Sequence, residues 1–359
     1  MGQNNDAMVK AKQNINRNVS LDIMRIVAAL AVILVHCSAN FIWGYELSTL
    51  EFTIGNFLDS VARFGAPLFV MISGALLLDE KKHIDGKSMW AKIKRTLFLI
   101  VSWSLLYASI NQIYIPWKLG TKIDVQAFIS AFIKGHFHMW YLYMMIGLYA
   151  AIPFLRYFVK IENSRIVIAF ALVAITSQFT SPILTALSVK HEEMVWIKDL
   201  ISQFEFKFFG GYIAYLLMGW YITHVGFDKK WKKLGIVGIG VLSLIWCFHY
   251  VQKTKDFGTA YEYLGLPVFI YSVAVFTALT ECKLSADGVV GKMIVKLSSL
   301  TFGVYIIHPL IQMDIDKHMK YTDNPVCYMI AYFLIITVIS FATSFAISKI
   351  PLLKKIVRG

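Results

Sequence analysis

Apolar residues fill most of this chain in long runs, and short polar segments separate one run from the next. Most runs have the length of about 18 to 25 residues that an α-helix needs to cross a hydrocarbon core of about 30 Å. Because a membrane span must satisfy its own backbone hydrogen bonds, continuous runs of this length favour helices. The pattern predicts an all-α fold, a polytopic membrane helix bundle with ten spans at residues 22–42, 54–78, 96–115, 138–157, 165–182, 206–224, 233–251, 262–280, 294–312 and 326–348.

Composition supports this fold class and excludes an ordinary soluble domain. Hydrophobic residues make up 57% of the 359 residues, charged residues only 16%, and the mean hydropathy is +0.61. The formal net charge is +13, but the basic residues gather in alternate connecting segments, as the positive-inside rule requires, and no nucleic-acid motif accompanies them. We therefore expect no nucleic-acid partner and place both termini in the cytoplasm. The expected organisation is a polar leader at 1–21, a transmembrane domain at 22–348 and a basic tail at 349–359.

Two further features bound the chemistry. The four cysteines, Cys37, Cys247, Cys282 and Cys327, have no CxxC spacing, so neither a disulfide framework nor a metal site is expected. The segment 79–95 is the most basic of the chain. It is either a topology anchor that touches anionic lipid or a docking surface for an anionic cytoplasmic donor such as coenzyme A.

The first predicted span contains two ionisable residues, Arg25 and His36. Such groups are costly inside a membrane, so each is a candidate functional residue. Eleven positions bring them back to nearly the same helix face, about 16 Å apart along the axis. Both side chains can therefore line one side of an internal cavity, with Arg25 near the cytoplasmic end and His36 in the outer half.

The second predicted span carries Asp59 and Arg63 on one face, at about the depth of His36. They are either an intrahelical ion pair that holds the span in the bundle or part of a site. Further along, Pro67, Ser73 and Gly74 permit close helix contact or a local opening of the hydrogen-bond ladder, and Ser73 lies near the depth of Arg25.

Further candidates lie at the start of the fourth span and in the ninth. His138 precedes Trp140, for which a place in the interfacial aromatic belt is the simpler explanation. Tyr305 and His308 fall in the ninth span, and His308, which precedes a proline, is either a packing group or a member of the site. Together with His36, Asp59 and Arg63, these histidines would form a polar cluster at one depth.

The cluster suits a reaction in which an imidazole takes a proton from an alcohol nucleophile and returns it to a leaving group. A neutral imidazole at His36 can act as general base, and a carboxylate such as Asp59 can orient it. An arginine cannot act as a base, but it suits phosphate, as expected for Arg25, or a developing oxyanion, as expected for Arg63.

At these residues the chain resembles the acyltransferase-3 family of membrane O-acyltransferases, over most of its length. The resemblance rests on Arg25 and His36 at their spacing, on the segment 63–74 (RFGAPLFVMISG), on the segment 138–142 and on the segment 302–308. It is closest to the branch without a soluble domain, which acetylates cell-surface glycans such as enterobacterial common antigen. The resemblance implies an acyl-CoA donor, most simply acetyl-CoA, with no permanently bound cofactor, and an acceptor hydroxyl on a glycan or its lipid-linked precursor.

The hypothesis from the sequence is thus a multi-pass O-acetyltransferase of the bacterial inner or plasma membrane. His36, Asp59 and Arg63 are the expected catalytic residues, Arg25 and Ser73 would bind the donor, and the acceptor would contact His138, Trp140, Tyr305 and His308. The alternative is a membrane transporter that uses the same buried charges as a proton or substrate relay. The unrelated class of membrane-bound O-acyltransferases is disfavoured by the Arg25–His36 pair.

Overall fold

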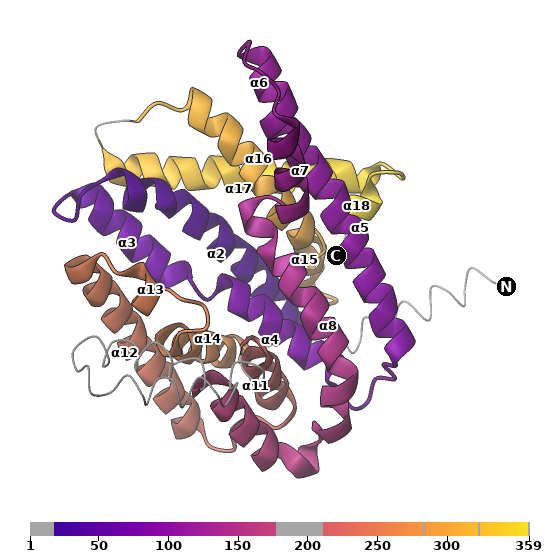
Figure 1. Ribbon diagram of the computed structural model, residues 1–359. Coiled ribbons are helices and arrows are strands. Elements are labelled where there is room, and N and C mark those ends of the chain that lie inside the picture. Colours follow the sequence, from indigo (N-terminus) through magenta and orange to yellow (C-terminus); the bar gives the residue numbers. More distant parts are fainter. Residues whose placement is uncertain (1–17, 177–210, 283, 322–323, 358–359) are drawn as a thin grey trace, which may run out of the picture.

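The computed structural model describes residues 18–176, 211–282, 284–321 and 324–357. Within these ranges every regular element is helical and no strand occurs. Helix α2 (Val19–Gly44) lies in the middle of the bundle and contacts helices on both sides of it (Figure 1). Asn18 caps its start, because the Asn18 side chain accepts a hydrogen bond from the Ser20 backbone N–H at 3.1 Å. The two ionisable residues of the first span are therefore central to the molecule.

The second predicted span is a broken helix. It consists of α3 (Leu50–Ala62) and α4 (Gly65–Leu77), separated by Arg63 and Phe64. Pro67 has no N–H to donate to the Arg63 carbonyl, which explains why the hydrogen-bond ladder opens there. Gly65 lets α4 approach α2, because a Cβ at Gly65 would lie 3.0 Å from the Ala28 carbonyl oxygen. The predicted local opening in this span is confirmed, and it places Arg63 at the break.

Helix α4 also crosses α11 (Ile213–His224) at very short range. A Cβ at Gly74 would lie 1.8 Å from the Leu216 carbonyl oxygen, and one at Gly219 would lie 2.0 Å from the Met71 carbonyl oxygen. Each glycine thus receives the backbone of the other helix, as small residues do at membrane helix crossings. This confirms the close contact predicted from Gly74.

On the α3–α4 side of α2 lie α11, α12 (Lys230–Thr254), α13 (Phe257–Ala260) and α14 (Leu266–Leu279) (Figure 1). On the other side lie α5 (Gly86–Ser109), α8 (Trp140–Phe158), α16 (Thr301–His318) and α17 (Pro325–Lys349). Helix α5 continues through the π-helical turn η1 (Ile110–Tyr114) into α6 (Ile115–Lys118), and α7 (Val125–Lys134) returns beside it. The short helix η2 (Phe137–Met139) leads directly into α8.

The remaining described helices are η3 (Ile161–Asn163), a helix over 164–176, α15 (Val289–Ser298) and α18 (Lys354–Val357). Helix α18 packs back onto the bundle: Val357 is buried, and the Trp103 indole N–H donates to the Ile356 carbonyl at 2.8 Å. Within the basic segment 79–95, Asp85 caps the start of α5. Hydrogen bonds from the Ser88 hydroxyl and backbone N–H hold the pKa of the Asp85 carboxyl below its usual value.

The described residues contain six helices long and apolar enough to cross a membrane, and a seventh if the bent pair α15–α16, with its 57° angle, is one span. These seven correspond to predicted spans one to four, seven, nine and ten. The eighth, 262–280, is represented by the shorter apolar helix α14. The fifth and sixth, 165–182 and 206–224, extend into 177–210, which lies outside the described residues. The all-helical class is confirmed, while the ten-span count and the cytoplasmic termini stay predictions.

Candidate active site

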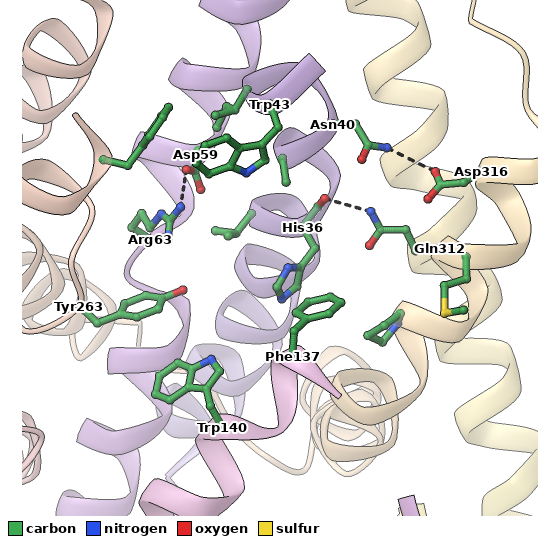
Figure 2. A pocket seen from close by; sticks show the side chains of 16 residues that line it. His36, Asn40, Trp43, Asp59, Arg63, Phe137, Trp140, Tyr263, Gln312 and Asp316 are labelled. Carbon is green, nitrogen blue, oxygen red and sulfur yellow. Dashed lines mark hydrogen bonds and ion pairs between the residues drawn. The ribbon is translucent and has the colours of Figure 1, made fainter. Parts of the chain in front are cut away.

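Two cavities flank α2 at different depths. The first, the His36 cavity, has a volume of about 450 Å³. Its wall comes from α2, α3, α8, α16 and the segments around α13 (Figure 2). The polar and aromatic side chains that line it are His36, Asn40, Trp43, Asp59, Arg63, Phe137, Trp140, Phe257, Tyr263, Gln312 and Asp316.

The second, the Arg25 cavity, consists of two adjoining pockets of about 230 and 350 Å³. Both pockets are lined by Arg25, Phe69, Ser73, Lys92, Tyr141, Tyr149, Thr301 and Phe302, and Arg95 and Tyr305 line the first of them. Two basic residues of the segment 79–95, Lys92 and Arg95, thus face this cavity.

An aromatic wall separates the two cavities. Trp140 lines the His36 cavity, whereas its neighbour Tyr141 lines the Arg25 cavity. On α16, Tyr305 faces the Arg25 cavity and Pro309, one turn later, faces the His36 cavity. The Tyr141 and Tyr305 rings lie 5.8 Å apart. Arg25 and His36 therefore lie in different cavities on either side of one wall, and the prediction that both line one internal cavity is wrong. Their separation of about 16 Å along α2 leaves room for the wall between them.

His36 is in direct contact with His308. Their rings stack at a centroid distance of 5.2 Å, and Phe137 covers His36 edge-on at 5.0 Å. The His308 Nδ1 lies 2.7 Å from the Tyr305 carbonyl oxygen and 3.3 Å from that of Val304. Because carbonyl oxygens only accept, Nδ1 carries a proton, and Nε2 of neutral His308 keeps its lone pair. His308 is thus held as one tautomer beside the candidate base.

His138 lies on the other side of His308, with ring centroids 5.7 Å apart. Tyr305 positions this segment, because its hydroxyl donates to the His138 carbonyl oxygen at 2.6 Å. His138 and His308 are both fully buried, and in each case Nε2 has no hydrogen-bond partner among the described residues. The structure therefore brings three of the predicted histidines together with Tyr305, although His138 and His308 do not line the His36 cavity themselves.

Asp59 and Arg63 form a 2.6 Å ion pair across the cavity from His36 (Figure 2). Arg63 also lies over the rings of Tyr261 and Tyr263, with Cζ 5.0 and 5.7 Å from their centroids. Asp59 is 1% exposed, and no hydrogen bond joins it to His36 in the described part of the chain. Asp59 therefore orients Arg63 and not His36. The pair is an intrahelical ion pair, as one interpretation held, and it also faces the cavity, as the other held.

On the opposite side of the cavity is a polar array that the sequence analysis missed. The Asn40 amide donates to Tyr332 at 3.1 Å and to Asp316 at 3.3 Å, and the Tyr332 hydroxyl donates to Asp316. The Gln312 amide donates to the His36 carbonyl oxygen at 3.0 Å (Figure 2). The array thus holds polar groups at the cavity surface in fixed orientations.

Arg25 is held by the buried carboxylate of Asp22, a residue that the sequence analysis did not name. Arg25 Nη1 lies 2.9 Å from Asp22 Oδ1, which accepts a second hydrogen bond from the Ser298 hydroxyl at 2.7 Å. Asp22 is 1% exposed, whereas the Arg25 side chain is 30% exposed toward the cavity. The predicted donor residue Ser73 lines the same cavity and donates to the Phe69 carbonyl oxygen at 3.0 Å. Within the described ranges no group of three or more His, Cys, Asp or Glu side chains is placed to hold a metal ion.

Comparison with known proteins identifies the family of this chain. No curated protein and no solved structure matches the chain. A family model described as an acyltransferase domain matches residues 18–348, nearly the whole chain and every residue of the two cavities described above. The apolar helices and this match together make the protein a membrane acyltransferase, and the chain belongs to the acyltransferase-3 family.

Proposed function

We propose that this protein is an integral membrane O-acyltransferase that moves an acyl group, most simply acetyl, from cytoplasmic acyl-CoA to a hydroxyl of a cell-surface glycan or its lipid-linked precursor. The observation that carries the proposal is the pair of cavities on one helix. One cavity is cationic, the other contains a histidine among polar and aromatic side chains, and a single aromatic wall separates them. On the predicted topology the Arg25 cavity opens to the cytoplasm of a bacterial inner or plasma membrane.

The Arg25 cavity has the chemistry for a phosphorylated donor. Arg25, Lys92 and Arg95 are three cations around one space, and arginine forks suit phosphate oxygens. Lys92 extends over the Tyr149 ring, with Nζ 6.0 Å from its centroid. Asp22 holds the Arg25 guanidinium without filling the cavity. Coenzyme A would place its phosphates here, and its flexible arm is long enough to carry the thioester toward His36.

The His36 cavity has the chemistry for a sugar. The cavity offers oriented hydrogen-bond donors and acceptors at Asn40, Gln312 and Asp316. A sugar needs such partners, because a hydroxyl group buried without a hydrogen bond is costly. Trp140 and Trp43 bring aromatic rings to the cavity wall, and the π-systems of such rings attract the polarised C–H groups of a sugar. These features support a glycan acceptor on this side of the wall, with Trp140 as a binding residue.

In the proposed reaction, His36 takes the proton of the acceptor hydroxyl while the oxygen attacks the thioester carbonyl carbon. Arg63, fixed by Asp59, stabilises the oxyanion of the tetrahedral intermediate. The C–S bond then breaks, an oxygen ester remains on the acceptor, and the coenzyme A thiolate takes the proton from His36, which restores the neutral base. His138 and His308 do not line the His36 cavity, so in this scheme neither contacts the acceptor. His308 contacts the His36 ring, and His138 contacts the His308 ring.

The test uses purified protein in proteoliposomes that contain the lipid and glycolipid extract of the native membranes, with acetyl-CoA labelled in the acetyl group. We expect coenzyme A release and labelled glycan with wild type, and loss of both with His36→Ala and with Arg25→Ala. His249→Gln, an exposed histidine on α12, is the matched control. Full transfer by His36→Ala would refute the assignment. Solute uptake without any acyl donor would favour the transporter instead.

A further inference from the structure

The short helix α18 lies outside the segment that the family model matches, because that segment ends at residue 348. Residues 349–355 are exposed, yet Val357 at the end of α18 is 1% exposed and packs in the same apolar cluster as Trp103 and Tyr305. A helix of four residues is not stable by itself in water. The contacts with the bundle therefore hold α18 in place.

These contacts connect α18 to both α5 and α16. The Trp103 indole N–H on α5 donates to the Ile356 carbonyl oxygen at 2.8 Å (Figure 1). Two turns earlier on α5, Arg95 Nη2 donates to the carbonyl oxygen of the residue before Ile356, at 3.4 Å. On α16, a Cβ at Gly303 would lie 3.1 Å from Val357 Cβ, so the two backbones are close together. Helix α18 therefore bridges α5 and α16.

The residues of α5 that face α18 and α16 lie on one side of the helix. Arg95, Leu99, Trp103 and Tyr107 recur at every fourth position, which places them along one stripe. The Tyr107 hydroxyl donates directly to the Ile306 carbonyl oxygen on α16, at 2.8 Å. Helix α5 is thus bonded to α16 directly at Tyr107, and through α18 in the turns nearer to its start.

Both helices contribute to the wall of the Arg25 cavity. The lining residues from α5 are Arg95, Thr96 and Leu99, and those from α16 are Thr301, Phe302 and Tyr305. Arg25 belongs to α2 and is fixed there by Asp22. The position of α5 relative to α16 therefore sets how far Arg95 lies from the other cations of the cavity. Among the described residues, none from α5 lines the His36 cavity.

We propose that α18 is a positioning element of the donor site, which holds α5 against α16 so that Arg95 faces the Arg25 cavity. The proposal rests on the proposed function, in which this cavity binds the phosphates of acyl-CoA. Without α18, Trp103 and Arg95 lose a carbonyl partner each, and the first turns of α5 can move away from α16. The attraction between a cation and a phosphate falls with their distance, so the affinity for the donor falls too. Helix α18 itself touches no reacting group.

The test measures the binding of coenzyme A to purified protein in detergent by isothermal titration. A truncation after Leu353 removes α18, and we expect it to raise the Kd for coenzyme A about 10-fold, because two hydrogen bonds and one buried valine are lost. In the transfer assay the KM for acetyl-CoA should rise by the same factor, with kcat and the acceptor KM unchanged. A protein that is merely destabilised would lose kcat as well.

Trp103→Phe is the milder variant. It keeps an aromatic ring in the apolar cluster and removes only the N–H that donates to Ile356. We expect a rise in the Kd for coenzyme A of about 3-fold, the effect of one neutral hydrogen bond. This variant decides the question if the truncated protein does not fold.

Two controls separate the contacts of α18 from its charge and from chain length. A truncation after Val357 removes only residues 358–359 and should bind coenzyme A as wild type does. The double variant Lys354→Gln, Lys355→Gln removes two exposed charges but keeps the backbone carbonyls that Trp103 and Arg95 contact. It should also bind as wild type does at about 0.15 M salt, where exposed charges are screened beyond about 8 Å.

The outcomes are distinct. A wild-type Kd in Trp103→Phe or in the protein truncated after Leu353 would overturn the positioning role. A double glutamine variant that loses as much affinity as the truncation would also overturn it, because α18 would then act by its charge. If wild type itself does not bind coenzyme A, the proposed function fails. Unchanged binding in the variants, with a wild type that binds, leaves the proposed function intact.

Discussion

The crossing of α4 and α11 allows a sharp test of how the Arg25 cavity is held together. In Gly74→Ala the new methyl group would lie 1.8 Å from the Leu216 carbonyl oxygen, against about 3.4 Å for ordinary contact. The two helices would have to separate by about 1.6 Å, since neither backbone can rotate away. Overpacking in rigid interiors costs about 1 to 3 kcal/mol, and a backbone-to-backbone contact belongs at the upper end. We expect a loss of about 3 kcal/mol, or a fall in Tm of about 4 °C for a chain of 359 residues.

The assay follows the exposure of buried thiols on heating in detergent. Cys37 and Cys247 are 0% and 1% exposed, so a thiol-reactive fluorescent dye labels them when the bundle opens. The matched control is Gly147→Ala on α8, where a Cβ would meet nothing within 4 Å. This control should keep or slightly raise the Tm, because alanine is the better helix former.

Gly74→Ala should also weaken donor binding, because α4 carries Phe69 and Ser73 into the Arg25 cavity. A Gly74→Ala protein with the thermal stability of wild type would refute the close crossing of α4 and α11. Gly219→Ala offers an independent check, since its methyl group would lie 2.0 Å from the Met71 carbonyl oxygen.

Three further predictions concern the site. Asp22→Asn should raise the KM for acetyl-CoA about 10-fold, equivalent to about 1.4 kcal/mol, with little change in kcat. The reason is that Arg25 loses its buried carboxylate, and initial rates over a series of donor concentrations measure the effect. Arg63→Lys should lower kcat about 100-fold with both KM values nearly unchanged, since a lysine replaces the fork that faces the oxyanion; an equal rise in KM would contradict that role. Asp316→Asn should raise the KM for the acceptor and leave the donor KM unchanged, and the reverse pattern would exclude the polar array from glycan binding.

Local geometry explains which parts of the site the sequence predicted. The spacing of Arg25 and His36 was predicted because both lie on one helix, whose periodicity is known. The wall that puts them in separate cavities comes from other helices and was not predicted. Helix periodicity could also have predicted three further cavity residues that the sequence analysis did not name. Asn40 lies one turn after His36, Gln312 and Asp316 lie one and two turns after His308, and all three line the His36 cavity.

Contacts between distant segments were out of reach. Nothing in the sequence alone brings Ser298 to Asp22, Leu216 to Gly74, or Lys92 beside Tyr149. The ion pair of Asp59 and Arg63 was predicted from its spacing, but its distance from His36 depends on how α3 packs on α2. A local opening was among the possibilities predicted for this span because Pro67 acts on its own helix, but its position after Ala62 was not predicted.

The aromatic wall has a consequence for how relatives of this enzyme diverge. Trp140 and Tyr141 are neighbours in the sequence but belong to different cavities. Under the proposed function, a substitution at Trp140 should alter the choice of acceptor, and one at Tyr141 or Phe69 should alter the choice of donor. The two choices would then be separable traits, and laboratory selection could address each in turn.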